Sequence, residues 1–193
     1  MSGYSLGPEM PEVPEVPSSR ARRGARPEAR SAAWFVALLA GSVLLGLLGG
    51  LIWAEIAPRA MLEEVGSGTA EVLNAETRAF FGADVWFCAI AVVAGLLTGL
   101  LGYRFAVAPR AGYARAAVAA ALILGAVGGG LAMMWLGGQI GLSAYTRHLA
   151  SSPNGTMFYA SLALGAKSAL ACWPLFTSFV LLVAEWGNRS SAS

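Results

Sequence analysis

The chain has 193 residues, of which 56% are apolar and only 12% are charged. Soluble domains carry roughly 25% charged residues, so this composition excludes an ordinary water-soluble fold. The apolar residues gather in stretches of about 20, the length of helix that crosses a bilayer. The sequence therefore predicts an all-α membrane protein, a bundle of four transmembrane helices with a disordered N-terminal tail.

Residues 1–31 are expected to lie outside the folded domain. A Pro-Glu tract of period three, from Pro8 to Pro17, favours extended polyproline structure. Five arginines follow between Arg20 and Arg30. We interpret the segment as a disordered cytoplasmic tail whose charge orients the first span, with docking of a partner or of anionic lipid as the alternative.

Aromatic residues bound the predicted spans. Trp34 and Trp53 lie 19 residues apart, which is about 28 Å of helix and suits the two interfaces of a membrane. A cleaved signal peptide is disfavoured here because the apolar run and its basic leader are too long. The transmembrane domain covers 32–187 and a short tail covers 188–193; the predicted spans are 33–54, 85–103, 116–136 and 158–184, and the outer loops are 55–84 and 137–157.

The structure of the first outer loop is left open. Gly66-Ser67-Gly68 is a turn signal between two short, partly apolar runs. Periodicity does not decide whether the turn joins a small hairpin or two helical turns.

The arginines are distributed unequally between the predicted sides. Nine lie in the N-terminal tail, the connector 104–115 and the C-terminal tail, whereas three lie in the outer loops. Positive residues favour the cytoplasmic side. The sequence thus predicts a multi-pass protein of the plasma (cell inner) membrane with both termini in the cytoplasm.

Lys167 is the only lysine of the chain and falls inside the predicted fourth span. A buried ammonium is costly in a bilayer, so such a residue pairs, reaches toward the interface or marks a pathway. Asp84, at the outer end of the second span, is its expected partner in an intramembrane ion pair. Pro174 is expected to kink the fourth span.

Glycines with a four-residue spacing predict close helix packing. Gly95 and Gly99 form one such pair, and Gly125 and Gly129 form another. Small residues at this spacing let two backbones approach, which replaces the hydrophobic drive that lipid removes. Packing within the bundle is the main interpretation, and homo-oligomerisation or docking of a partner is the alternative.

Patterns of catalysis and cofactor binding are not found. The sequence has no zinc-protease, nucleophile-elbow or phosphate-loop motif, and no Cys/His cluster with metal spacing. Cys88 and Cys172 are interpreted as small buried apolar residues. We therefore expect no enzyme activity, cofactor, metal or nucleic acid.

Three runs of residues carry a family resemblance. They are the stretch from Ala75 to Gly99, the stretch Ala169–Leu175, and the stretch Trp53–Pro58. Over about residues 33–185 the chain resembles an uncharacterised family of actinobacterial four-span membrane proteins, known only as a domain of unknown function. Relatives enter the second span by Ala-Asp-Gly, whereas here Asp84 is followed by Val85.

Two functions compete on these observations. The first is a non-enzymatic accessory, assembly or interaction subunit that lies in the lipid bilayer and binds a membrane protein partner or a second copy. The alternative is a small transporter or channel component in which Lys167 and Asp84 belong to a polar pathway.

Overall fold

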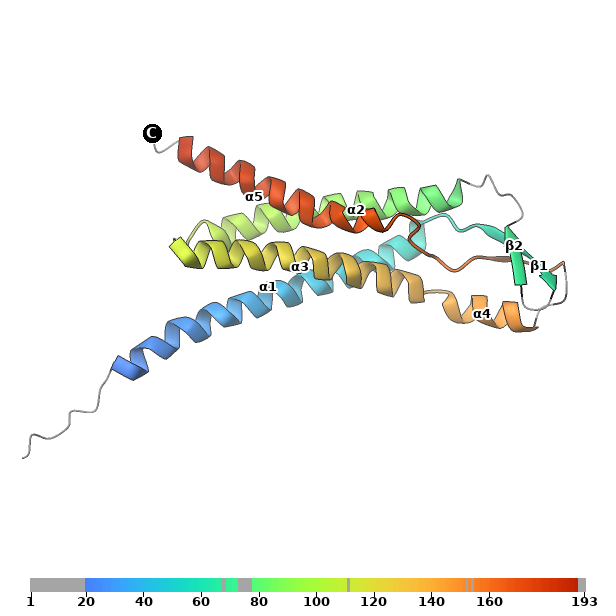
Figure 1. The fold of residues 1–193 in the computed structure, drawn as a ribbon, viewed down its shortest axis with the longest axis horizontal. Coiled ribbons are helices and arrows are strands. Elements are labelled where there is room, and N and C mark those ends of the chain that lie inside the picture. Colours follow the sequence, from blue (N-terminus) through green and yellow to red (C-terminus); the bar gives the residue numbers. More distant parts are fainter. Residues whose placement is uncertain are drawn as a thin grey trace, which may run out of the picture.

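The computed structural model describes residues 20–66, 69–72, 78–110, 112–151, 153 and 155–190. Four long helices run side by side in it (Figure 1): α1 (Arg20–Ile56), α2 (Ala79–Gly102), α3 (Gly112–Gln139) and α5 (Cys172–Ser190). All four are long and apolar enough to cross a membrane. The predicted all-α bundle of four spans is confirmed.

The N-terminal boundary of the bundle differs from the prediction. α1 begins at Arg20, so the arginine cluster belongs to a helix rather than to a disordered tail. Arginine and alanine favour helix, and adding residues to an existing helix carries no nucleation cost. The Pro-Glu tract lies outside the described residues.

The second span is longer than predicted. α2 begins at Ala79 because Phe80 and Phe81 extend its apolar run, and it continues into a π-helical turn at Tyr103–Val107. With that turn the apolar helix reaches Val107. α3 then starts at Gly112 and ends at Gln139, slightly beyond the predicted third span.

The prediction for the fourth span, 158–184, is wrong in its first third. Met157–Tyr159 forms strand β3, the chain stays extended to Ala166, and helix starts with the 3-10 turn η2 (Lys167–Ala171). Backbone pairing with the first outer loop explains this: Ala160 N–H donates to Ala60 O at 2.8 Å. The apolar helix therefore runs from Lys167 to Ser190.

Pro174 lies near the beginning of the fourth apolar helix. It is the third residue of α5, immediately after η2. A proline in the first turn lacks only an N–H that has no partner in an α-helix. Pro174 therefore lies close to the change from 3-10 to α-helix, and the kink expected there stays a prediction.

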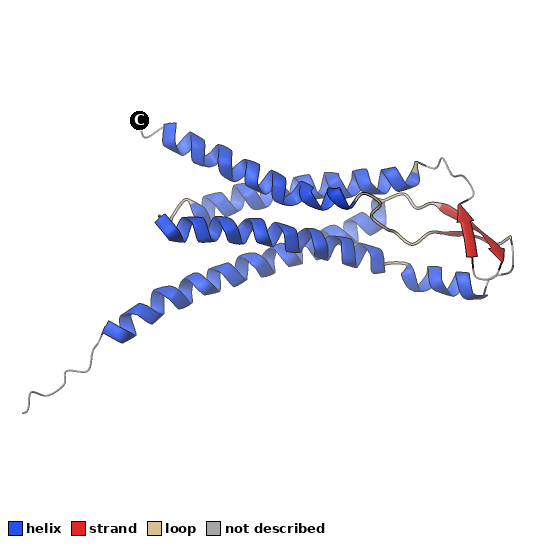
Figure 2. Ribbon diagram, in the orientation of Figure 1, coloured by secondary structure: helices blue, strands red, loops and turns tan. Residues whose placement is uncertain are grey.

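Both outer loops join in one small cap at the end of the bundle opposite the C-terminus (Figure 2). Strand β1 (Met61–Gly66) pairs antiparallel with β2 (Thr69–Val72) and with β3, in the order β2-β1-β3. The hairpin alternative for loop 55–84 is thus the correct one. The second loop adds the short helix α4 (Leu142–Ser151), which the sequence did not predict.

Aromatic residues hold the cap together and join two helices of the bundle where the cap begins. His148 of α4 stacks on Phe158 of β3, with ring centroids 5.7 Å apart. The fully buried Trp53 donates from Nε1 to Ala83 O at 2.8 Å and meets Phe87 edge-on. Trp53 therefore ties the last turn of α1 to the first turns of α2, at the level where the cap begins.

Candidate functional site

The predicted packing glycines lie where two helices meet. A Cβ on Gly95 would stand 2.8 Å from Trp173 O, and one on Gly99 would stand 2.7 Å from Val180 Cβ. Both neighbours belong to α5. These two glycines thus form the seam between α2 and α5.

The second pair forms the seam between α1 and α3. A Cβ on Gly125 would stand 2.7 Å from Ser42 Oγ, and one on Gly129 would stand 2.7 Å from Ser42 O. Gly46 completes the contact from the α1 side, because its Cβ would overlap the carbonyl oxygen of Gly129. Side chains as small as alanine therefore do not fit at the centre of this seam without movement.

A short chain of polar groups crosses the α2–α5 seam. Trp173 donates from Nε1 to Thr98 Oγ1 at 3.1 Å, and the Thr98 hydroxyl lies 2.7 Å from Ala94 O. Thr177 Oγ1 lies 3.1 Å from the same Thr98 oxygen and 3.3 Å from Gly95 O. Trp173 and Thr177 are fully buried. Each polar atom of this group has a partner, so it locks the helices together and leaves no group free for a ligand.

An apolar groove separates α1 from α2. α1 packs chiefly on α3, and α2 packs chiefly on α5, whereas α1 and α2 touch each other little. The groove has two sections of about 380 Å³ and about 410 Å³, and Leu45 and Leu97 line both of them. It extends along α1 from Trp34 to Ile52, and Gly41 lines it with no atom within 4 Å of its Cβ position.

Asp84 is bound to the backbone of the extended segment before η2. Gly165 N–H donates to Oδ1 and Ala166 N–H donates to Oδ2, each at 2.9 Å. A carboxylate that accepts two amide hydrogen bonds makes a strong, charge-assisted contact. Asp84 therefore holds this segment against the start of α2.

The predicted ion pair between Lys167 and Asp84 is not formed. Within the part of the chain that the structure describes, both ion pairs involve Glu185 instead. Lys167 is exposed at the first residue of η2, where the fourth apolar helix begins. It lies at the edge of that helix and not at its centre, because the residues before it form strand and extended chain.

The opposite end of the bundle carries a cationic cluster around Glu185. Arg115 donates from Nη1 to both carboxylate oxygens of Glu185, at 3.0 and 3.2 Å. Arg189 adds a longer contact of 3.9 Å, and the Arg110 guanidinium lies 5.1 Å from the ring centre of Trp34. We call this the arginine end, and the end with the sheet the cap end.

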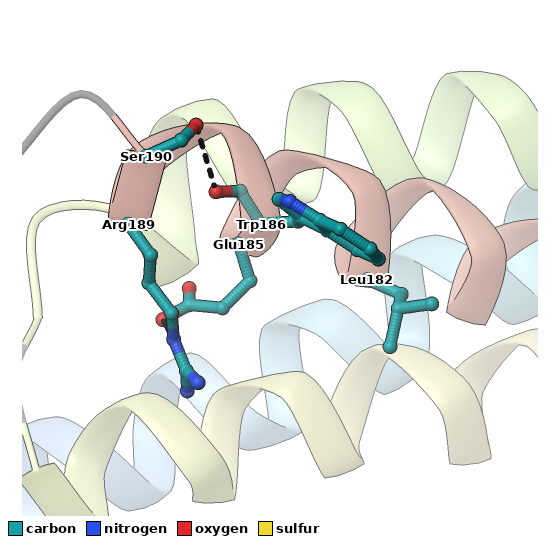
Figure 3. Close-up of a pocket in the computed structure, with 5 residues that line it drawn as sticks. All are labelled: Leu182, Glu185, Trp186, Arg189 and Ser190. Atoms are coloured by element: carbon teal, nitrogen blue, oxygen red, sulfur yellow. Dashed lines mark hydrogen bonds and ion pairs between the residues drawn. The ribbon is translucent and has the colours of Figure 1, made fainter.

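A hollow of about 500 Å³ lies beside this cluster (Figure 3). Glu185 and Arg189 extend to the same side of α5 there, and the Trp186 ring lies along the helix. All the residues that line it come from the last turns of α5. Since no second element closes over it, the hollow is a poor binding site.

The two cysteines lie next to each other. Cys172 Sγ is 3.4 Å from Cys88 Sγ, although 84 positions separate the residues in sequence. Both are free thiols and both are half-buried. The sequence identified their apolar surroundings but gave no signal that they meet.

Among the described residues no group of His, Cys, Asp and Glu is arranged to hold a metal ion. Comparison with protein families, with curated proteins and with solved structures finds no match for this chain. The resemblance to an actinobacterial membrane family therefore stays a prediction. The features of the molecule on which a function can rest are the groove, the two seams, the cap and the cysteine pair.

Proposed function

We propose that this chain is a non-enzymatic membrane subunit that binds one transmembrane helix of a partner protein in the groove between α1 and α2. The length of the groove carries the proposal. Its α1 wall extends from Trp34 to Ile52, which is about 27 Å at the rise of an α-helix. The hydrocarbon core of a bilayer is about 30 Å thick, so the groove covers nearly all of it.

A helix suits this shape better than a lipid chain. An acyl chain from one leaflet reaches only to the midplane, about 15 Å, so one lipid fills only one of the two sections. A partner helix fills both. Small residues such as Gly41 and Ala94 line the groove, and small residues allow the close backbone approach on which helix association in lipid depends.

The alternative, a transporter or channel component, has less support. Its polar pathway needs Lys167 and Asp84 inside the membrane, and Asp84 instead binds two backbone amides at the cap end. The buried polar groups of Thr98, Thr177 and Trp173 are bonded to one another or to backbone carbonyls, and the Ser42 hydroxyl donates to Leu38 O. A helix-binding subunit accounts for the groove without any such pathway.

Site-specific photo-crosslinking in the host membrane tests this proposal. A benzophenone side chain at Leu97, on the groove wall, should give one protein adduct whose crosslinked peptide lies in an apolar segment of another protein. The same group at Leu175, exposed on α5, is the matched control and should give lipid adducts only. The substitution Gly41→Phe puts a large side chain into the groove from a position whose Cβ would meet no atom within 4 Å, so it should abolish the protein adduct.

Three results would contradict the proposal. Lipid adducts alone at Leu97 would make the groove a lipid surface. Equal protein adducts at Leu97 and Leu175 would show unspecific crowding. An adduct between differently tagged copies of the chain would make the occupant a second copy instead of a partner.

We further infer that the arginine end lies in the cytoplasm of the host and the cap end outside. Arg104, Arg110, Arg115 and Arg189 and the first turns of α1 all belong to the arginine end, and positive residues favour the cytoplasmic side. With Cys88 and Cys172 replaced by serine, an impermeant maleimide added to intact cells should label Ser151→Cys on α4 but not Ser190→Cys on α5. Labelling of Ser190→Cys alone would reverse the orientation.

A further inference from the structure

We propose that Cys88 and Cys172 form a dithiol site that reacts with a small disulfide compound and closes a disulfide bond between α2 and α5. This inference does not depend on the occupant of the groove. It rests on the placement of the two sulfurs, on the packing that keeps them together and on the pocket that opens onto them.

The sulfurs are already close to bonding distance. They lie 3.4 Å apart, and a disulfide bond is about 2.05 Å long. The difference of about 1.4 Å can be closed by rotation of the two side chains about their Cα–Cβ bonds.

The seam between α2 and α5 maintains this proximity. Trp173, the neighbour of Cys172, is fully buried and bonded to Thr98 of α2. Gly95 allows α5 to lie directly on α2 just below the cysteines. The two thiols are therefore held face to face by contacts that do not involve sulfur.

A pocket gives small molecules access to the pair. Its volume is about 340 Å³, and both cysteines line it together with Phe81, Val85 and Asp84. Phe81 is 73% exposed, so the pocket is open at that side. Cys88 lies five residues beyond Ala83, the partner of Trp53 at the cap end, which is about 7.5 Å along the helix. A small disulfide therefore has a short path to the sulfurs from the cap end.

The reaction is a thiol–disulfide exchange in two steps. One cysteine thiolate attacks a sulfur of the incoming disulfide, so that a mixed disulfide forms and one thiol leaves. The second cysteine thiolate then attacks the bound cysteine sulfur, the intramolecular disulfide forms and the second thiol leaves. The two protons of the cysteines end on the two released thiols, and the incoming disulfide is the oxidant that takes both electrons.

Intact-mass measurement on the full-length protein in mild detergent tests this. Treated with dipyridyl disulfide, the wild-type protein should lose two hydrogens, release two thiopyridones per chain and retain no pyridyl group. Cys88→Ser and Cys172→Ser should each retain one pyridyl group, because the resolving thiol is missing. A reductant should restore the original mass of the wild-type protein.

Two outcomes overturn the proposal. If the wild-type protein retains two pyridyl groups, the thiols react independently and do not pair. If the folded protein releases no thiopyridone although the protein in dodecyl sulfate does, the pocket gives no access. The wild-type arm needs no substitution, so misfolding of a variant does not confuse the result.

Discussion

On α1, Gly46 and Gly41 are five positions apart and have opposite surroundings. A Cβ on Gly46 would overlap the carbonyl oxygen of Gly129 across the seam with α3, whereas Gly41 has no atom within 4 Å of its Cβ position. The same helix thus has one face closed on a neighbour and another face open along the groove. The comparison shows that a glycine in a membrane helix is a packing residue only where a second backbone has been brought against it.

The largest expected effect separates these two glycines. Gly46→Ala should lower the free energy of unfolding by about 3 kcal/mol, because the seam has no room for a methyl group. Gly41→Ala is the matched control and should raise it by up to about 1 kcal/mol, since alanine favours helix. Reversible unfolding in mixed micelles with dodecyl sulfate measures both; equal changes in the two variants would show that the seam is not tight.

The second test extends the comparison to the seam between α2 and α5, where hydrogen bonds accompany the glycines. Thr98→Val removes the acceptor of the buried Trp173 N–H, and we expect a loss of about 1.5 kcal/mol in the free energy of unfolding. Thr98→Ser keeps the hydroxyl and should lose less than half as much. A serine variant as unstable as the valine variant would assign the effect to the methyl group instead of the hydrogen bond.

The smallest expected change in the free energy of unfolding concerns the contact of Asp84 at the cap end, which we compare with the two seams. Asp84→Asn leaves one carbonyl oxygen for two amide donors, so it should lower the free energy of unfolding by about 1 kcal/mol. Lys167→Met should change it by less than about 0.5 kcal/mol, because Lys167 is exposed.

The double variant then measures their coupling, which should be close to zero for residues that do not interact. A coupling of about 1 kcal/mol would instead restore the ion pair expected from the sequence. It would also restore support for the transporter alternative.

The sequence predicted the positions of the spans better than it predicted which elements surround them. Apolar stretches and bounding tryptophans located three helices, although each helix extends beyond its predicted span, because lipid demands a continuous apolar run whatever the neighbours are. The fourth was misjudged because residues 158–166 are apolar enough for a span, and yet Phe158 and Tyr159 pair with β1 and Ala160 N–H donates to Ala60 O. Apolarity alone does not distinguish a short buried strand from the start of a helix.

The site residues were predicted in part. Gly95, Gly99, Gly125 and Gly129 do lie at helix contacts, whereas Asp84 binds amides and not Lys167. From the sequence, we expect an isolated acidic residue to pair with an isolated basic residue. The backbone N–H groups that compete for the carboxylate are brought to it only by the fold.

What the sequence determined by itself is the class of protein, the number of spans and the unequal distribution of arginines, because each follows from local composition. Only the tertiary structure decided which face of each helix is closed, at the two seams, and which is open, at the groove between α1 and α2. It also decided that two distant loops form one sheet and that Cys88 meets Cys172. The physical reason is that a membrane helix is apolar on every side. Such a helix has no amphipathic pattern to indicate its buried face, so its rotation is set by packing against its neighbours.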